Sequence, residues 1–435
     1  MTIHISLLFL HKRRIGDLKI WLRSIERQQP IAILLLTSNQ TEEPAQELIA
    51  DSNHQIEVVN LDKPNKPIAP KSQKSQIANF FAELRFSFGE FRRSYRNAKT
   101  ILKPYRQTVV VTYDNRMPVV LAVLKAAKSL KLPVFLPSLL IATPSRNVTT
   151  ANTLRPMRQI EKWLVRLIRR FLPHQISNEG RLYYDPVSLL LLLMKRSLPE
   201  NPWATGNQRL VDRIGIESIR VRDELLAFGV SSEKMVVTGL PAYDFMDFSV
   251  AKTQSSPAIL LFALPQYAEH GAMKLVDALT VIRPIFQALT SFDGRVIISL
   301  HPRMNLQDYR GIIDEFKFEW TLGGVDEWLK SASMFVATNS SSTIYWALML
   351  GIPTIVLNHT YPKSDAFRDF QSLRYVDDDV SLELPQYLKT HDDQFPQRLA
   401  ADQEKLSKPL VSDGNCGARN IRIISQLKKD TPPTH

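Results

Sequence analysis

Ser299-Leu-His-Pro-Arg-Met-Asn305 and Val336-Ala-Thr-Asn-Ser-Ser-Ser-Thr343 each carry a short apolar run into a polar turn. In the first stretch the run ends at His301-Pro302, because proline cannot donate a ladder hydrogen bond. In the second stretch the serine turn leads into a helical segment that Gly351-Ile-Pro353 terminates. Both stretches therefore predict a strand, a polar turn and a helix of an open parallel sheet, whose carboxyl edge binds ligands.

The serine turn has the composition of a phosphate site. Its four polar residues, Asn339, Ser340, Ser341 and Ser342, stand where a helix begins, and the free N–H groups of a helix start attract anions. Capping of the helix uses the same residue types in the same geometry. Phosphate binding is our prediction for these four residues, and simple capping remains the alternative.

Four further residues are predicted to lie at the same edge. His301 is the strongest candidate, because a donating imidazole would offset charge that builds on a departing nucleotide. Pro302 adjoins it, and Arg303 is able to pair with a phosphate through two nitrogens. Gln266 follows Leu264-Pro at the end of another apolar run and is predicted to line the site. The alternatives are a histidine that caps its own loop and a solvated arginine.

Composition and charge limit the classes of function. The chain has 435 residues, of which 44% are hydrophobic and 23% charged, values typical of a soluble globular protein with two domains. The only cysteine, Cys416, excludes an internal disulfide or a cysteine-cluster metal site. No apolar run approaches the roughly 20 residues that span a bilayer. The net charge of +12 suits a phosphorylated ligand or an anionic membrane, whereas no nucleic-acid-binding motif is present.

Apolar runs alternate with helical segments along most of the chain, which predicts an α/β fold with parallel sheets. The first strands are expected at Ile3–Leu10, Ile31–Leu36, Ile56–Val59, Thr108–Thr112 and Leu132–Pro137. We predict an N-terminal domain over residues 1–245, a linker over 246–257, a second domain over 258–428 and a tail over 429–435. The alternation is interrupted at 138–208, where we expect a helical, basic insertion in the first domain.

The insertion contains an amphipathic segment with a basic face. Apolar and basic residues divide at helical spacing, and Arg166, Arg169 and Arg170 are accompanied by the aromatic residues Trp163 and Phe171. One interpretation is a helical subdomain that packs against the sheet. The other is a surface over 154–196 that binds anionic lipid.

Two segments upstream of the linker resemble the end of the N-terminal domain of GT-B glycosyltransferases. They are Ser218-Ile-Arg-Val-Arg-Asp-Glu-Leu-Leu-Ala-Phe-Gly229 and Lys234-Met-Val-Val-Thr-Gly-Leu-Pro-Ala-Tyr-Asp244. His301-Pro302 and Ser340-Ser341-Ser342 resemble the HP and serine motifs of a narrower group. That group comprises bacterial sialyltransferases, capsule Kdo-transferases and CDP-glycerol glycerophosphotransferases. Where many relatives carry Asp-x-Ser-Ser, this chain has Thr338-Asn-Ser-Ser341.

The resemblance implies two Rossmann-like domains that face each other across a cleft. It also implies transfer of a sugar from a nucleotide-activated donor, CMP- or CDP-linked in preference to UDP-linked, to a surface-glycan or lipid-linked acceptor. The implied location is the cytoplasm, with peripheral binding to the inner face of the plasma membrane as a further expectation. Three different functions remain open: a CDP-glycerol-type glycerophosphotransferase, a UDP-HexNAc 2-epimerase and a non-catalytic partner in polysaccharide assembly. UDP-GlcNAc 2-epimerases carry a Glu-Glu pair where this chain has Tyr345-Trp346.

The acceptor side is predicted from fewer signals. Inverting transfer needs a base, and Asp114 at a strand end is the first candidate, ahead of Asp17 and Glu217. A turn or a helix cap is the competing interpretation of Asp114. Three basic residues after the first strand, His11, Arg13 and Arg14, are predicted to bind an anionic acceptor, with solvated loop charge as the alternative. Gly239 is expected either to contact the donor or to shape a strand exit. No Asp-x-Asp motif follows a strand, so no obligatory metal or other cofactor is expected, and Asp377-Asp-Asp379 is taken as a solvated turn.

Overall fold

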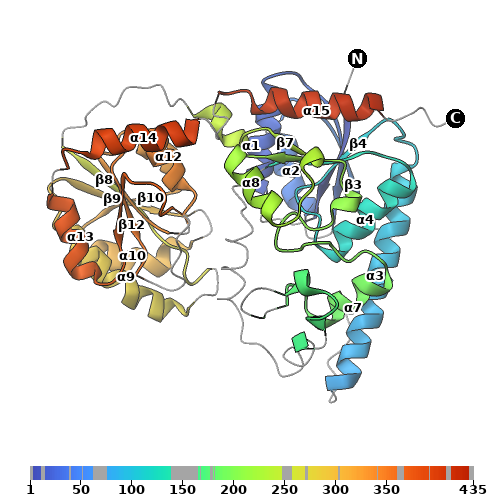
Figure 1. Ribbon diagram of the computed structural model, residues 1–435, viewed down its shortest axis with the longest axis horizontal. Helices are drawn as coiled ribbons and strands as arrows, with labels where there is room; N and C mark the ends of the chain where they lie inside the picture. The colour runs from blue at the N-terminus through green and yellow to red at the C-terminus, as the bar shows by residue number, and fades with distance from the viewer. Residues whose placement is uncertain are drawn as a thin grey trace. The chain divides into compact units, whose positions relative to one another are not determined.

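The computed structural model describes residues 3–10, 15–38, 41–50, 52–61, 76–138, 165–166, 168–176, 180, 182–246, 257–269, 273–301, 304–339, 341–359, 367–390, 392–407 and 413–430. Six of the predicted site residues lie outside these ranges: His11, Arg13, Arg14, Pro302, Arg303 and Ser340. The described chain divides into two units, each built on its own parallel sheet (Figure 1).

The first unit contains a seven-stranded sheet in the order β3-β2-β1-β4-β5-β6-β7, and all its strands are parallel. Apolar β-branched and leucine side chains fill these strands, as expected for a sheet covered on both faces. The strands are β1 (His4–Phe9), β2 (Ala32–Thr37), β3 (Gln55–Asn60), β4 (Val109–Val111), β5 (Val134–Leu136), β6 (Arg213–Ile216) and β7 (Met235–Val237). The helices are α1 (Ile15–Glu26), α2 (Glu42–Ala50), α3 (Gln76–Leu102), α4 (Pro118–Ser129), α7 (Pro186–Met194), α8 (Ile219–Ala227) and α15 (Cys416–Asp430), with a short 3-10 helix η5 (Pro241–Phe245).

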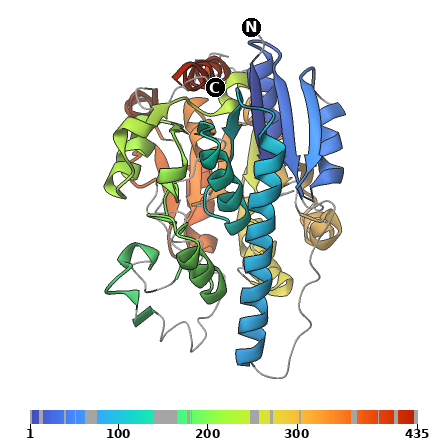
Figure 2. The same ribbon diagram turned by 90° about the vertical axis from the view of Figure 1, so that its right-hand side faces the viewer.

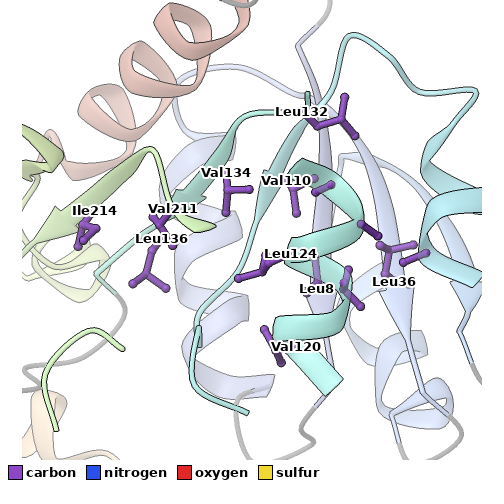
Figure 3. Packing of buried hydrophobic residues seen from close by; sticks show 14 of the residues in the cluster. Leu8, Leu36, Val110, Val120, Leu124, Leu132, Val134, Leu136, Val211 and Ile214 are labelled. Carbon is purple, nitrogen blue, oxygen red and sulfur yellow. The ribbon is translucent and has the colours of Figure 1, made fainter. Parts of the chain in front are cut away.

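The core of the first unit lies between the sheet and its helices. Figure 3 shows Val120 and Leu124 of α4 over Leu8 and Val110 of β1 and β4. Each of these four side chains is at most 3% exposed, so together they remove a large apolar area from water. This packing fixes α4 on the sheet and thereby fixes the turn that joins β4 to α4.

The second unit contains a six-stranded parallel sheet in the order β10-β9-β8-β11-β12-β13. Its strands are β8 (Ile259–Ala263), β9 (Arg295–Leu300), β10 (Glu319–Leu322), β11 (Met334–Thr338), β12 (Thr354–Leu357) and β13 (Leu373–Val376). Its helices are α9 (Leu275–Leu289), α10 (Leu306–Glu315), α11 (Val325–Leu329), α12 (Thr343–Met349), α13 (Val380–Lys389) and α14 (Phe395–Ser407). The chain order reverses between β8 and β11, and ligands of doubly wound sheets bind at such a point.

The last helix belongs to the first unit, which corrects the predicted second domain over 258–428. Cys416 and Gly417 donate their N–H groups to the buried Asp244 carboxylate, each over 2.8 Å. A side chain on Gly417 would meet the carbonyl oxygen of Ser24 at 2.0 Å, so glycine permits the close approach of α15 to α1. The sequence prediction placed this helix in the second domain because it follows that domain along the chain. The hydrogen bonds at its start and its close packing on α1 attach it to the first unit instead.

Among the described residues, no helix is both long enough and apolar enough to cross a membrane. The predicted insertion contains α7, and Gln175 and Tyr184 near it are buried. The part of the predicted lipid-binding segment before residue 165, which includes Trp163, lies outside the described residues.

Candidate functional site

The ends of β9, β8 and β11 meet at the carboxyl edge of the second sheet. Adjacent strands lie about 4.8 Å apart, so the outer two of these three ends are about 10 Å apart. The strand register places both His301 and Asn339 level with Pro265, the residue before Gln266. The structure therefore brings together three of the predicted donor residues, which are far apart in the sequence.

Buried polar atoms without a hydrogen-bond partner occur on the elements that flank this edge. In the part of the chain that the structure describes, Gln266 Oε1, Glu269 Oε2 and Trp346 Nε1 are covered but unpaired. The other oxygen of Glu269 accepts a hydrogen bond from the Tyr309 hydroxyl over 2.8 Å. Burial of an unpaired polar atom costs free energy, so such atoms are uncommon in folded proteins unless a ligand or water satisfies them.

His301 lies in a tight turn that starts α10. Its carbonyl oxygen accepts a hydrogen bond from the Met304 N–H over 2.8 Å, and its own N–H points at Met304 Sδ over 3.3 Å. Met304 is 4% exposed and belongs to the core of the unit, whereas His301 is half-buried. The turn therefore anchors the backbone of His301 in the core and leaves its side chain at the sheet edge.

The serine turn precedes α12, and the residue at its N-cap position makes no side-chain capping bond. Ser342 occupies the N-cap position of α12 in a helical backbone conformation, and its side chain makes no capping bond. Ser341 donates its N–H to the Thr338 carbonyl over 3.0 Å, and its hydroxyl lies 2.6 Å from the Thr343 hydroxyl. Ser342 therefore does not provide the side-chain cap that the alternative interpretation of this turn expects.

Asn339 has a structural partner that the sequence did not indicate. Its side-chain amide donates to Asn358 Oδ1, and Asn358 Nδ2 in turn donates to Asp377 Oδ1 over 2.8 Å. Arg368 donates to the same Asp377 oxygen, so Asp377 is not the solvated turn residue that we predicted. These bonds, which we call the strand-end relay, connect the carboxyl ends of β11, β12 and β13. They hold the start of the serine turn in place.

The first unit has a cavity of about 110 Å³ at the carboxyl ends of β4, β5 and β6. Asp114 lies on its wall with Asn115, Arg116, Ser138 and Thr205, and the rest of the lining is mainly apolar residues of β5, β6, α8 and the adjoining loops. The Thr205 hydroxyl is buried and has no partner among the described residues. The cavity therefore combines a carboxylate, a guanidinium and an unpaired hydroxyl with apolar walls, a combination that suits a small polyhydroxylated ligand.

Asp114 is held by Arg116 on both carboxylate oxygens. Oδ1 accepts the Arg116 N–H over 2.6 Å, which forms the turn that the sequence allows, and Oδ2 lies 3.5 Å from the guanidinium. Tyr184 donates its hydroxyl to the Arg116 carbonyl over 2.7 Å. Gly206 has φ of +76°, and a side chain there would meet Arg116 Cγ at 2.5 Å. The loop that carries Gly206 thus closes directly over the Asp114 turn.

Glu217, a weaker candidate from the sequence, is the most perturbed carboxyl group among the described residues of this unit. It follows β6, is 2% exposed, and accepts a hydrogen bond from the Tyr243 hydroxyl over 3.0 Å. Burial raises the pKa of Glu217 to about 7, although the Tyr243 hydrogen bond and the charge of Arg220 both act to lower it. A carboxyl group that titrates near neutral pH is suited to proton transfer.

Gly239 belongs to the first unit and not to the sheet that carries the other predicted donor residues. It has φ of +77°, a conformation that favours glycine, and its carbonyl oxygen lies 3.5 Å from Cys416 Sγ. Both facts fit a residue that shapes the exit of β7 towards η5. Within the described ranges, no three His, Cys, Asp or Glu side chains are grouped as metal ligands.

Known structures with the same fold are numerous, although sequence comparisons against protein-family models and curated proteins find no match. The structure of LpCGTa in complex with UDP is 13% identical over 98% of this chain and 99% of its own, with a TM-score of 0.56. The glycotransferase of kitacinnamycin is 12% identical over 98% and 99%, with a TM-score of 0.54. UDP-GlcNAc 2-epimerase from Neisseria meningitidis, bound to UDP-GlcNAc, is 13% identical over 98% and 100%, with a TM-score of 0.52.

These similarities show the fold. It is the GT-B fold. Two Rossmann-like units with parallel sheets were expected from the sequence, and that prediction is confirmed. At such low identity, the substrates of the similar proteins do not carry over to this chain.

Proposed function

We propose that the protein transfers a glycosyl group from a nucleotide-activated donor to a hydroxyl of a surface-glycan or lipid-linked acceptor. The observation that carries the proposal is the presence of unpaired buried polar atoms, Gln266 Oε1 and Trp346 Nε1, on the elements beside the switch point of the second sheet. A nucleotide with its ribose and phosphates supplies both donors and acceptors for such atoms. We favour CMP- or CDP-linked donors over UDP-linked donors because of the HP and serine motifs at His301 and Ser341.

In this proposal the second unit holds the leaving group. The bond between the anomeric carbon and the donor phosphate breaks, and its electron pair stays on the phosphate. His301 and the Ser341 hydroxyl donate hydrogen bonds to that phosphate as its charge grows, which stabilises the transition state more than the bound substrate. Arg303 and Ser340 are proposed to take part in the same contact.

In this proposal the first unit binds the acceptor and supplies the base. The acceptor oxygen forms the new bond to the anomeric carbon and gives its proton to a carboxylate. Asp114 is the proposed base because it lies on the wall of the cavity, and Arg116 fixes its orientation. Glu217 is the competing candidate because its pKa is near 7, although its side chain is almost fully covered.

Nucleotide binding and product analysis test this function together. The melting temperature is measured with CMP, CDP, UDP and their sugar conjugates, because a ligand of the folded state raises it. The proposal expects a shift with a cytidine nucleotide, and nucleotide release from its sugar conjugate that an acceptor accelerates. No shift with any of these ligands would contradict it and favour a non-catalytic partner.

Product analysis also distinguishes glycosyl transfer from epimerisation and from glycerophosphate transfer. A UDP-GlcNAc 2-epimerase would consume UDP-HexNAc without an acceptor, and the similar structures make this the second candidate. A glycerophosphotransferase would release CMP from CDP-glycerol. Transfer is also proposed to be independent of metal, so chelation by EDTA should leave the rate unchanged.

A further inference from the structure

Helix α3 extends well beyond the core that it helps to form. Its 27 residues span about 40 Å at the usual rise of 1.5 Å per residue. Figure 2 shows it running past the sheet of the first unit, with its N-terminal half away from the strands. None of the described side chains between Asn79 and Glu90 is buried, and the first buried one is Phe91. Leu84 and Phe88 of this outer half pack against a small core, but its other described side chains are not part of that core.

Large apolar side chains stand exposed on α3 and the two segments next to it. Phe81 of α3 is 61% exposed, and Phe171 is 74% exposed. Leu193 and Met194, at the end of α7, are 41% and 56% exposed. The three segments contribute Phe91, Ile168 and Leu192 to one small core, so they form one continuous part of the unit. Four large apolar residues on one such surface are more than scattered exposure accounts for.

The end of α7 is located against α3 by a cation–π contact. Lys195 Nζ lies 3.3 Å from the centroid of the Phe88 ring. Phe81 is seven residues before Phe88, which is about 10 Å along the helix axis. Met194 and Phe81 therefore belong to the same surface, within the reach of a single membrane or partner.

Positive charge surrounds these apolar side chains. Glu83 and Asp185 are the exposed acidic residues among the described positions of 79–102, 165–176 and 182–196, whereas seven arginines of the same segments are exposed: Arg85, Arg92, Arg96, Arg166, Arg169, Arg170 and Arg196. The pKa of Lys195 is lowered, first by burial and then by the charges of Arg92 and Lys125, as expected where cations gather. An anionic partner would relieve this repulsion.

We propose that this surface binds the face of a bilayer that contains anionic lipid. We call it the α3–α7 face and define it by Phe81, Phe171, Leu193, Met194, Arg85, Arg92, Arg169, Arg170 and Arg196. Phenyl, leucine and methionine side chains enter the acyl boundary while arginines contact phosphates at the surface. Nucleic acid would satisfy the arginines but would give Leu193 and Met194 nothing to bury against. The proposal does not depend on glycosyl transfer.

Vesicle co-sedimentation tests the proposal on the full chain. Vesicles of phosphatidylcholine alone are compared with vesicles that also contain phosphatidylglycerol, at low and high NaCl. We expect binding only to the anionic vesicles, weakened by salt. The triple variant Phe81→Ser, Leu193→Ser, Met194→Ser should bind at least tenfold more weakly at low salt. Each of Arg169→Gln and Arg196→Gln should weaken binding about fivefold.

Controls come from equally exposed residues of the second unit. Val276 and Leu382 are 74% and 71% exposed, so the variant Val276→Ser, Leu382→Ser should bind vesicles like the wild type. Melting temperatures should be unchanged in all variants, because the replaced side chains are exposed. Absence of wild-type binding to anionic vesicles, or equal losses in the control, would overturn the proposal. Binding of RNA or DNA that depends on the same arginines, without vesicle binding, would assign the face to nucleic acid instead.

Discussion

Asn358 donates from Nδ2 to Asp377 Oδ1 over 2.8 Å, and this bond joins the carboxyl end of β12 to that of β13. On its other side, Asn358 accepts the side-chain amide of Asn339. The serine turn thus starts from a residue whose side chain is fixed by the two neighbouring strand ends. A proposed phosphate site held in this way is pre-organised and needs little rearrangement when the ligand arrives.

Asn358→Ala should disrupt the strand-end relay. We expect a loss of about 1–3 kcal/mol in the free energy of unfolding, because Asn339 and Asp377 lose a buried partner. We also expect nucleotide affinity to fall about tenfold, measured by calorimetry at a temperature where the variant is folded. Asn60→Ala is the control, since Asn60 also ends a strand but lies in the other unit and donates to Glu42. Unchanged affinity in Asn358→Ala would show that the relay does not support the site.

Asp114→Asn should lower the rate of transfer at least a hundredfold and leave donor affinity unchanged, because asparagine cannot accept the acceptor proton. Asp212→Asn is the matched control. Asp212 also forms an ion pair, with Lys128 over 2.6 Å, but it precedes β6 and so lies at the opposite edge of the sheet. Equal transfer rates in Asp114→Asn and the wild type, with a large loss in Glu217→Gln, would move the role of base to Glu217.

Glu217 should make the protein less stable as the pH rises. Its pKa is about 7 in the folded chain and 4.5 ordinarily, so the folded state binds more protons between these values. Stability is therefore expected to fall between about pH 4.5 and 7 and to level off above. Glu217→Gln should remove this loss, on the order of 3 kcal/mol at pH 8 relative to pH 5. Urea unfolding at both pH values measures it, with the exposed Glu233→Gln as control. A wild-type stability that is flat across this range contradicts the assignment.

Asp244→Ala should weaken the attachment of the last helix to the first unit. The carboxylate accepts the N–H groups of Cys416 and Gly417, and it also accepts the hydroxyl of Ser24. Removal of these three bonds from a buried site should cost about 2–5 kcal/mol of unfolding free energy. Hydrogen exchange should increase first at the start of α15. Asp223→Ala, at an exposed ion pair with Arg222, should change stability by less than about 1 kcal/mol.

The sequence was sufficient to locate the edge of the sheet where the proposed donor site lies. Gln266, His301 and Asn339 were recognised because each is among the first polar residues after a buried apolar run, and parallel strands bring all such residues to one edge. Asn358 and Asp377 carry the same signal after β12 and β13, so the strand-end relay was within reach of that rule. The hydrogen bonds of the relay could not be predicted from the sequence, since they depend on side-chain directions that residue spacing does not specify.

Several features of the fold depend on contacts between distant parts of the chain. Cys416 lies 172 residues from the Asp244 that binds its N–H, and nothing local marks α15 as part of the first unit. Strand β10 was also missed, because it lies at the sheet edge and Trp320 and Leu322 are exposed rather than part of a buried run. The Asp114 turn was foreseen, but not the loop with Gly206 that closes over it.

The most direct test of the proposed mechanism is the rate of nucleotide release by His301→Ala, measured with acceptor present and with the donor that wild-type protein uses best. Because His301 is proposed to act only as charge builds on the leaving phosphate, we predict a loss of at least a hundredfold, with an unchanged melting temperature and nucleotide affinity reduced less than tenfold. Turnover close to that of the wild type, across CMP-, CDP- and UDP-linked donors, would contradict the account.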